Sequence, residues 1–202
     1  LGEILLPRRE MPVEWVLESE VDVFIYLDSE DRLVATLKQP RIMPGEFGKL
    51  KCVALTGVGA FLDWGLPKDL LVPFREQKVR MEIGKTYLVF VMVDEKSRRL
   101  VATTRIARHF DLSPAEYATG DEVNLTVFGK TEMGYKAIIN NAHSGLIFGN
   151  EVFQELSQGE KLKGWITGVR ADGKIDISLH PPGRERVDDL EKQIMGELIA
   201  RG

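Results

Sequence analysis

The sequence has little cysteine, little histidine and no long apolar run, and each scarcity excludes a class of protein. Its one cysteine, Cys52, cannot form an internal disulfide, and its three histidines do not join it in any metal-ligand spacing. No stretch approaches the ~18 apolar residues of a membrane span, and the first residues lack the basic start and apolar run of a signal peptide. We therefore expect no disulfide, no metal, no other cofactor, no membrane partner and a cytoplasmic location.

Catalytic signatures are also missing from the sequence. The segment Gly57-Val58-Gly59 lacks the third glycine and the following helix of a dinucleotide-binding fingerprint, and neither a Walker lysine nor a nucleophile elbow is present. The histidines lie far apart, without a partnered carboxylate or thiol, and a surface position is expected for each. The sequence therefore predicts a protein that is not an enzyme and has no catalytic residues.

The charge is unevenly distributed along the chain. The net charge of −4 argues against non-specific phosphate binding by the chain as a whole. Residues 47–107 hold 11 Lys or Arg against 6 Asp or Glu, whereas residues 1–46, 108–183 and 184–202 hold 5 against 10, 7 against 10 and 4 against 5. The middle of the chain is a basic island in an acidic protein.

Internal repetition is the strongest organisational signal. Residues 21–36 (VDVFIYLDSEDRLVAT) and 87–104 (YLVFVMVDEKSRRLVATT) read almost alike, and both alternate apolar and polar residues around a charged turn, as a β-hairpin does. Upstream, Arg9-Glu10 matches Arg75-Glu76 at the same spacing. A third copy follows 75 residues further on, where Gly59 matches Gly134 and Glu76 matches Glu151.

Short strands with glycine-rich turns predict an all-β chain of tandem five-stranded barrels of the oligonucleotide-binding (OB) type. We expect a partial first barrel and linker over residues 1–46, beginning at its middle strands, and a complete second barrel over 47–107. A linker over 108–119 and a complete third barrel over 120–183 follow. Residues 184–202, with apolar residues at helical spacing, are expected to form a helix.

The linker carries a capping signal. Ser113, Pro114 and Glu116 have the N-cap, first-turn proline and N3 glutamate of a capping box, so the sequence predicts a short helix there.

The segments TGVGAFLDWG (56–65) and DLLVPFRE (69–76) carry the clearest motif. They resemble the S-one RNA-binding domain, with matches at Gly59, Ala60, Phe61, Leu71, Val72, Glu76, Gly84 and Arg99. Three departures stand beside these matches. Pro73 occupies the family's histidine position, Val58 its first aromatic position, and Lys136 stands in the third barrel where Phe61 stands in the second.

Over its whole length the chain resembles the conserved virulence factor B family, with three such domains followed by a winged helix. The segments YLDSEDRLVAT, GAFLDWGLPKDLLVPFREQ and KIDISLHPPG carry this resemblance. It implies RNA binding and post-transcriptional regulation, and it makes residues 184–202 the first helix of a winged helix.

OB barrels bind single strands by stacking bases on aromatic rings beside backbone-binding cations. The candidate RNA-binding residues are Phe61, Phe74, Arg75, Lys49, Lys51, Lys68 and Arg99. Strand alternation places Phe61 and Asp63 on one face and Ala60 and Leu62 on the other, so Phe61 faces the ligand if Asp63 is solvated. For each phenylalanine the alternative is a core position, and for Arg99 a solvated charge in a hairpin turn.

Other aromatic residues are expected to be structural. Trp64 is expected in the core or at its rim, and Phe148 and Trp165 inside the third barrel.

The sequence favours a non-catalytic protein that binds single-stranded RNA, mainly through the second barrel. A protein-binding scaffold with protein partners is the alternative.

Overall fold

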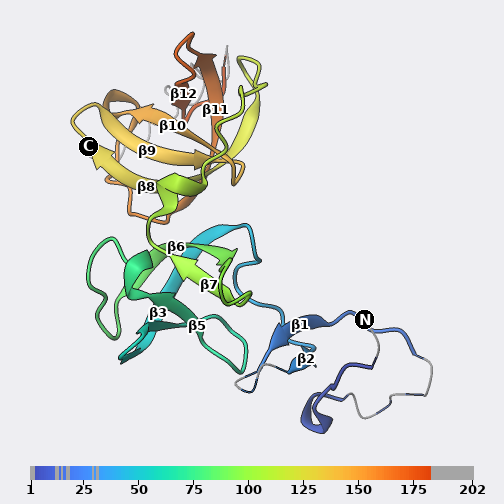
Figure 1. Cartoon of the computed structure of the whole chain (residues 1–202). Helices are drawn as coiled ribbons and strands as arrows, with labels where there is room; N and C mark the ends of the chain where they lie inside the picture. The colour runs from blue at the N-terminus through green and yellow to red at the C-terminus, as the bar shows by residue number, and fades with distance from the viewer. Residues whose placement is uncertain are drawn as a thin grey trace, which may run out of the picture. The chain divides into compact units, whose positions relative to one another are not determined.

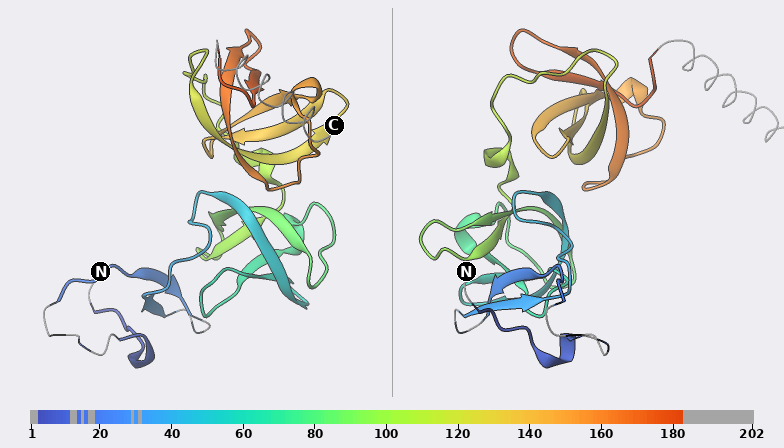
Figure 2. Two further views of the ribbon diagram at one scale, coloured as in Figure 1. Left: turned by 180° about the vertical axis from the view of Figure 1, so that it is seen from behind. Right: turned by 90° about the vertical axis from the view of Figure 1, so that its right-hand side faces the viewer.

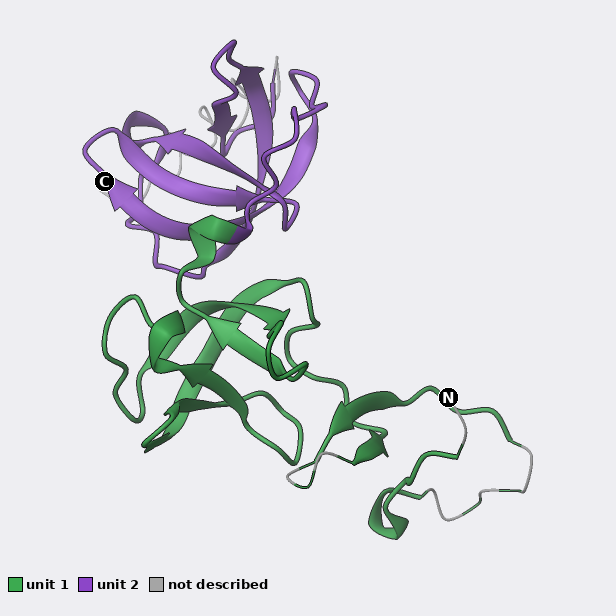
Figure 3. Cartoon of the chain, in the orientation of Figure 1, with its two compact units in different colours: residues 1–108 green, residues 109–202 purple. Residues whose placement is uncertain are grey.

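The computed structural model describes residues 3–11, 14, 16, 19–28, 30 and 32–182, and the chain divides into two compact units, residues 1–108 and 109–202 (Figure 3). Within these described residues, the regular elements are strands and short 3-10 helices (Figure 1). The expected C-terminal helix over 184–202 lies outside the described residues.

The first unit begins with a small hairpin. Strand β1 (Phe24–Leu27) pairs antiparallel with β2 (Leu33–Thr36), and Leu5 forms a parallel bridge with Val34. A 3-10 helix, η1 (Arg8–Glu10), lies between these segments in the sequence. In the described part of residues 1–46, the regular pairing is therefore a two-stranded sheet.

The second barrel follows in the same unit. Its elements are β3 (Phe47–Thr56), β4 (Gly59–Asp63), β5 (Leu70–Pro73), η2 (Phe74–Glu76), β6 (Thr86–Val93) and β7 (Leu100–Thr103). The strands pair in the order β5-β4-β3-β6-β7, and β5 and β7 lie close enough to complete the barrel by contact. Its core includes Leu50, Leu62, Val72, Val89 and Ala102.

Trp64 closes one end of this core. Its side chain is 3% exposed, and its indole N–H donates a hydrogen bond of 2.7 Å to the carbonyl oxygen of Ile42. The expected core position of Trp64 is confirmed, and the polar end of the ring is satisfied as a buried indole requires.

The second unit contains a closed barrel. Its elements are η3 (Ile106–His109, which begins in the first unit), β8 (Glu122–Thr131), β9 (Gly134–Ile139), β10 (His143–Phe148), η4 (Gly149–Glu151), β11 (Lys161–Val169) and β12 (Ile175–Ser178). The strands follow the order β10-β12-β11-β8-β9, with β10 and β12 parallel. Figure 2 shows this barrel, coloured from yellow to orange-red, from two further sides. The all-β fold with tandem five-stranded barrels is thereby confirmed.

Two glycines fix the same close approach in both barrels. Gly59 and Gly134 have φ of +155° and +144°, and an added Cβ would lie 2.2 Å from the Val72 oxygen and 2.1 Å from the Ile147 oxygen. Since no side chain fits against these carbonyls, the first hairpin of each barrel requires glycine at this position.

The helix expected at Ser113 is wrong. Residues 111–118 contain no helix, and the Ser113 backbone N–H instead donates to Asp111 Oδ1. Tyr117 and Ala115 pack as extended chain against the core of the third barrel. These tertiary contacts outweigh the local capping signal, because a helix of so few residues is too short to be stable by itself.

The expectation that Phe148 and Trp165 pack inside is also wrong. Ile147 is fully buried, and so is Ile166, whereas Phe148 and Trp165 are only partly buried on the alternate positions. Strand alternation therefore turns both rings to the outside of the barrel.

Candidate nucleic-acid interface

The outer face of β4 presents Phe61. Ala60 and Leu62 are fully buried, whereas Phe61 and Asp63 are partly exposed on the opposite side of the strand. The two-residue turn Gly57-Val58 places Gly59 of β4 opposite Thr56 of β3. On its other side β4 pairs with β5, where Phe61 lies opposite Leu71. The alternation expected from the sequence holds, and Phe61 lies outside the core.

Phe61 lines a groove with a volume of about 760 Å³. The second barrel, called barrel 2 below as the third is called barrel 3, contributes β4, β5 and the turns after β3 and β6. Together these make up the surface where OB folds bind oligonucleotides. The β1–β2 hairpin contributes the opposing residues Ile25, Tyr26, Leu27 and Leu33. The lining is mainly apolar, with Lys68, Arg98 and Arg99 as its cations and Asp69 as its carboxylate.

Two titratable side chains in the lining of the groove have raised pKa values. Burial raises the pKa of Tyr26, with the negative charge of Glu10 adding to the effect. Burial also raises the pKa of Asp69, and the neighbouring Asp63 carboxylate raises it further. Both shifts favour the uncharged forms of these two side chains.

Lys68 connects the hairpin to the barrel. Its ammonium donates hydrogen bonds of 2.8 Å to the Leu27 oxygen and 2.7 Å to the Asp28 oxygen. The structure thus places this candidate at the groove, where two of its three donors serve to hold the hairpin.

Arg99 and Arg98 lie in the β6–β7 turn, at the edge of the groove. The Arg99 carbonyl accepts a hydrogen bond from the Asp94 N–H, which closes the turn. Arg98 has a φ of +57°. Within the described residues, its guanidinium makes no hydrogen bond or ion pair.

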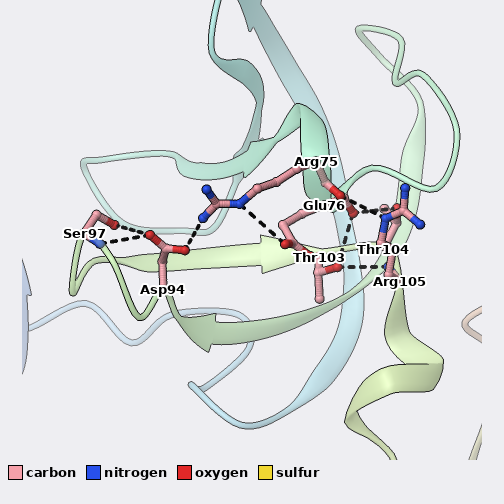
Figure 4. Close-up of polar contacts among 7 residues, drawn as sticks. All are labelled: Arg75, Glu76, Asp94, Ser97, Thr103, Thr104 and Arg105. Atoms are coloured by element: carbon pink, nitrogen blue, oxygen red, sulfur yellow. Dashed lines mark hydrogen bonds and ion pairs between the residues drawn. The ribbon is translucent and has the colours of Figure 1, made fainter.

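Arg75 lies in an ion-pair network (Figure 4). Its guanidinium pairs with Asp94, and with Glu76 at 3.7 Å. The Ser97 side chain and N–H hold the pKa of Asp94 below its usual value, and Arg75 adds to this effect. Because both partners are carboxylates, a phosphate would have to compete with them for Arg75.

Phe74 lies apart from the groove. Its ring is 48% exposed and lines a shallow hollow of about 380 Å³ with Gln77, Lys78, Val79 and Arg80. The structure does not bring Phe74 together with Phe61, although the sequence joined them in one candidate set.

Lys49 and Lys51 are exposed on the outer face of β3. Lys51 lies directly opposite Asp63 of β4, whose carboxylate pairs with Arg41 at 2.5 Å. The two lysines therefore extend the outer face of the barrel alongside the strand that carries Phe61.

Sequence reasoning missed three candidate residues, one on this surface and two on barrel 3. Tyr26 lines the groove from a different repeat, and only the three-dimensional placement of the hairpin identifies it. On barrel 3, the Arg170 guanidinium lies 5.9 Å from the centroid of the Phe148 ring. The sequence does contain a signal for Phe148, because the 75-residue spacing aligns it with Pro73, the position of the family's histidine.

Among the described residues, no three His, Cys, Asp or Glu side chains gather where they could hold a metal ion. In the same part of the chain, no helix is long and apolar enough to cross a membrane.

The sequence pattern of the S1 domain, the S-one domain named above, matches residues 1–38 and 44–105. With the strand pairing, this match defines a protein with tandem S1-type OB barrels. The chain is 29% identical over 185 residues to the uncharacterized protein YitL of Bacillus subtilis, covering 88% of this chain and 62% of that protein. It is 23% identical over 193 residues to conserved virulence factor B of Staphylococcus epidermidis, covering 92% and 64%. The expected assignment is confirmed: the chain belongs to the conserved virulence factor B family.

The chain is also similar to a solved structure, a multidomain protein with nucleic acid binding domains from Streptococcus pneumoniae. The identity is 20% and the TM-score 0.45, over 98% of this chain and 73% of that one. The chain spans 62 and 64% of the two relatives named above.

Proposed function

We propose that this chain is a non-catalytic protein that binds single-stranded RNA through the outer face of barrel 2. The observation that carries the proposal is the groove at the OB ligand surface, with the Phe61 ring in its wall and arginines at its edge. An aromatic ring offers a stacking platform to any unpaired base, and the cations bind the backbone.

Charge supports the same barrel. Residues 47–107 carry the chain's excess of basic side chains. Three of these, Lys49, Lys51 and Arg98, make no ion pair with any described residue, so they can bind phosphate without losing a protein partner. Barrel 2 therefore carries most of the affinity in this proposal, and barrel 3, with Phe148 and Arg170, contributes less.

The wider role rests on the family. We propose that RNA binding serves post-transcriptional regulation in the cytoplasm, and that residues 184–202 begin a winged helix. We also propose that residues 1–46 form part of a first barrel, and that residues 47–107 and 120–183 each form a complete barrel.

A salt series tests the proposal. Fluorescence anisotropy with a labelled 12-nucleotide RNA should give an association constant that falls linearly on a logarithmic salt axis. Two or three phosphate contacts predict a slope of about −1.4 to −2 for a single strand. An RNA duplex of equal length should bind more weakly, because its bases cannot reach Phe61. Undetectable or salt-independent binding would contradict the proposal.

Matched lysines locate the contact. Lys49→Ala and Lys51→Ala should each reduce the salt slope by about 0.7, the contribution of one phosphate contact on a single strand. Lys161→Ala, a substitution of an exposed strand lysine on barrel 3, should leave the slope nearly unchanged.

The apolar lining of the groove favours one other function, a scaffold that binds an apolar peptide. A peptide bound by apolar contacts would show little salt dependence, and RNA would not displace it. The salt series and a competition with RNA therefore separate the two functions.

A further inference from the structure

The groove is built by two parts of the chain that lie far apart in sequence. Its barrel wall contains Phe61 and Leu71, and its hairpin wall contains Tyr26 and Leu33. The groove exists because the β1–β2 hairpin rests against the ligand face of the next barrel.

Specific contacts hold the hairpin in that place. Lys68 of the barrel donates two hydrogen bonds to hairpin carbonyls, at Leu27 and Asp28. The Phe24 ring meets the Trp64 ring edge-on, with centroids 5.6 Å apart and planes at 89°. Since Trp64 belongs to the barrel core, the hairpin is anchored by both polar and apolar contacts.

The chemistry of the walls selects the ligand. The hairpin wall contributes the ring of Tyr26, the barrel wall contributes Phe61 and the largely buried Trp64, and Arg98 lies at the edge. A volume of 760 Å³ falls within the range of roughly 300 to 1,000 Å³ that is typical of small-molecule sites. A flat, uncharged ring system with an anionic substituent matches apolar walls and a cationic edge.

We propose that the hairpin and barrel 2 form one slot for an unpaired nucleobase, with Tyr26 on one wall, Phe61 on the other and the adjoining phosphate at Arg98. This inference rests on the proposed function and adds a partner element to it. The RNA site of barrel 2 is incomplete without the hairpin of the preceding repeat.

A double-mutant cycle on the full chain tests the slot. The probe is a 12-nucleotide single-stranded RNA with one 2-aminopurine, whose fluorescence reports stacking. Tyr26→Ala and Phe61→Ala should each weaken binding by about 5- to 150-fold, the effect of losing one stacked base. Because both rings serve one base, the double variant should lose less than the product of the two single losses. Tyr26→Phe should retain both affinity and fluorescence quenching.

A second variant distinguishes the loss of the aromatic ring from a loss of folding. Tyr26→Leu keeps an apolar side chain against the barrel while removing the aromatic face, and thermal unfolding should show that it folds. It should bind RNA as weakly as Tyr26→Ala does.

The outcomes separate the two claims. If Phe61→Ala weakens binding and the Tyr26 variants do not, the barrel face binds RNA and the slot is wrong. Losses that multiply fully in the double variant would also overturn the slot. If RNA does not bind the wild-type chain, or if an apolar peptide displaces it from the groove, the proposed function fails too.

Discussion

The hydroxyl of Ser178 donates a hydrogen bond to the carboxylate of Glu151, which ends the 3-10 helix η4. The same arrangement joins Thr36 to Glu10 in the first repeat. In barrel 2 the Thr103 hydroxyl contacts the backbone oxygen of Glu76 instead, at 3.2 Å. In barrels 2 and 3 the bond connects the end of the last strand to the helix after the third strand, so it holds these two edges together, and in the first repeat it connects the end of β2 to η1.

Ser178→Ala should therefore destabilise barrel 3. The substitution leaves a partly buried carboxylate without this donor and also removes the acceptor of the His180 N–H. We expect a loss of about 1 to 3 kcal/mol in the free energy of unfolding, measured by urea denaturation. Ser144→Ala, at an exposed strand position of the same barrel, is the control. Equal stability of the two variants would show that the lock contributes nothing.

Gly59→Ala should destabilise barrel 2 by at least about 1 to 3 kcal/mol, the usual effect of a rarely populated backbone conformation. A Cβ at this position would also approach the Val72 oxygen, and β5 would have to move. Gly57→Ala is a matched control two residues away, because a Cβ there meets no atom within 4 Å. Thermal unfolding should give a lower melting temperature for Gly59→Ala than for Gly57→Ala. The opposite order would contradict this account.

Asp94 should make the stability of barrel 2 depend on pH. The Ser97 hydrogen bonds and Arg75 lower its folded pKa below the usual 3.8, so its ionised form is preferred in the folded state. The resulting stabilisation is fully present above pH 3.8 and is lost as the pH falls through the lower folded value. Asp94→Asn should reduce the urea midpoint at pH 7, and the difference from wild type should shrink toward pH 3. A difference that does not change with pH would contradict this.

Arg98→Gly should separate binding from stability. Glycine adopts the φ of +57° without strain but loses more chain entropy on folding, so stability should change by less than about 1 kcal/mol. The salt slope for RNA should fall by about 0.7, because Arg98 contacts one phosphate in the proposed site. Lys96→Ala removes a charge from the same turn but lies outside the groove lining, and it should leave the slope unchanged.

Much of the fold follows from local patterns in the sequence. The repeated hairpins, the paired glycines Gly59 and Gly134 and the alternation around Phe61 each depend on neighbouring residues, and period-two patterning captures them. The capping signal at Ser113 failed because Tyr117 packs on the third barrel, a contact that no local pattern contains.

The site was less predictable than the fold. Phe61 was identified because its neighbours Ala60 and Leu62 are core residues. Tyr26 could not be joined to Phe61, since their proximity depends on how the hairpin docks on the barrel. The sequence predicts that Lys68 and Arg75 bind RNA, and their contacts with Leu27 and Asp94 show that both also hold the structure together.

The most direct test of the account compares Phe61→Ala with Lys136→Ala, the corresponding position on barrel 3. Both are strand residues on the outer face, and only Phe61 offers a ring for base stacking. Titration with single-stranded RNA at two salt concentrations should show a loss of about 1 to 3 kcal/mol for Phe61→Ala at both, and a smaller loss for Lys136→Ala. Equal losses for the two variants, or no loss for Phe61→Ala, would contradict the claim that barrel 2 binds the RNA.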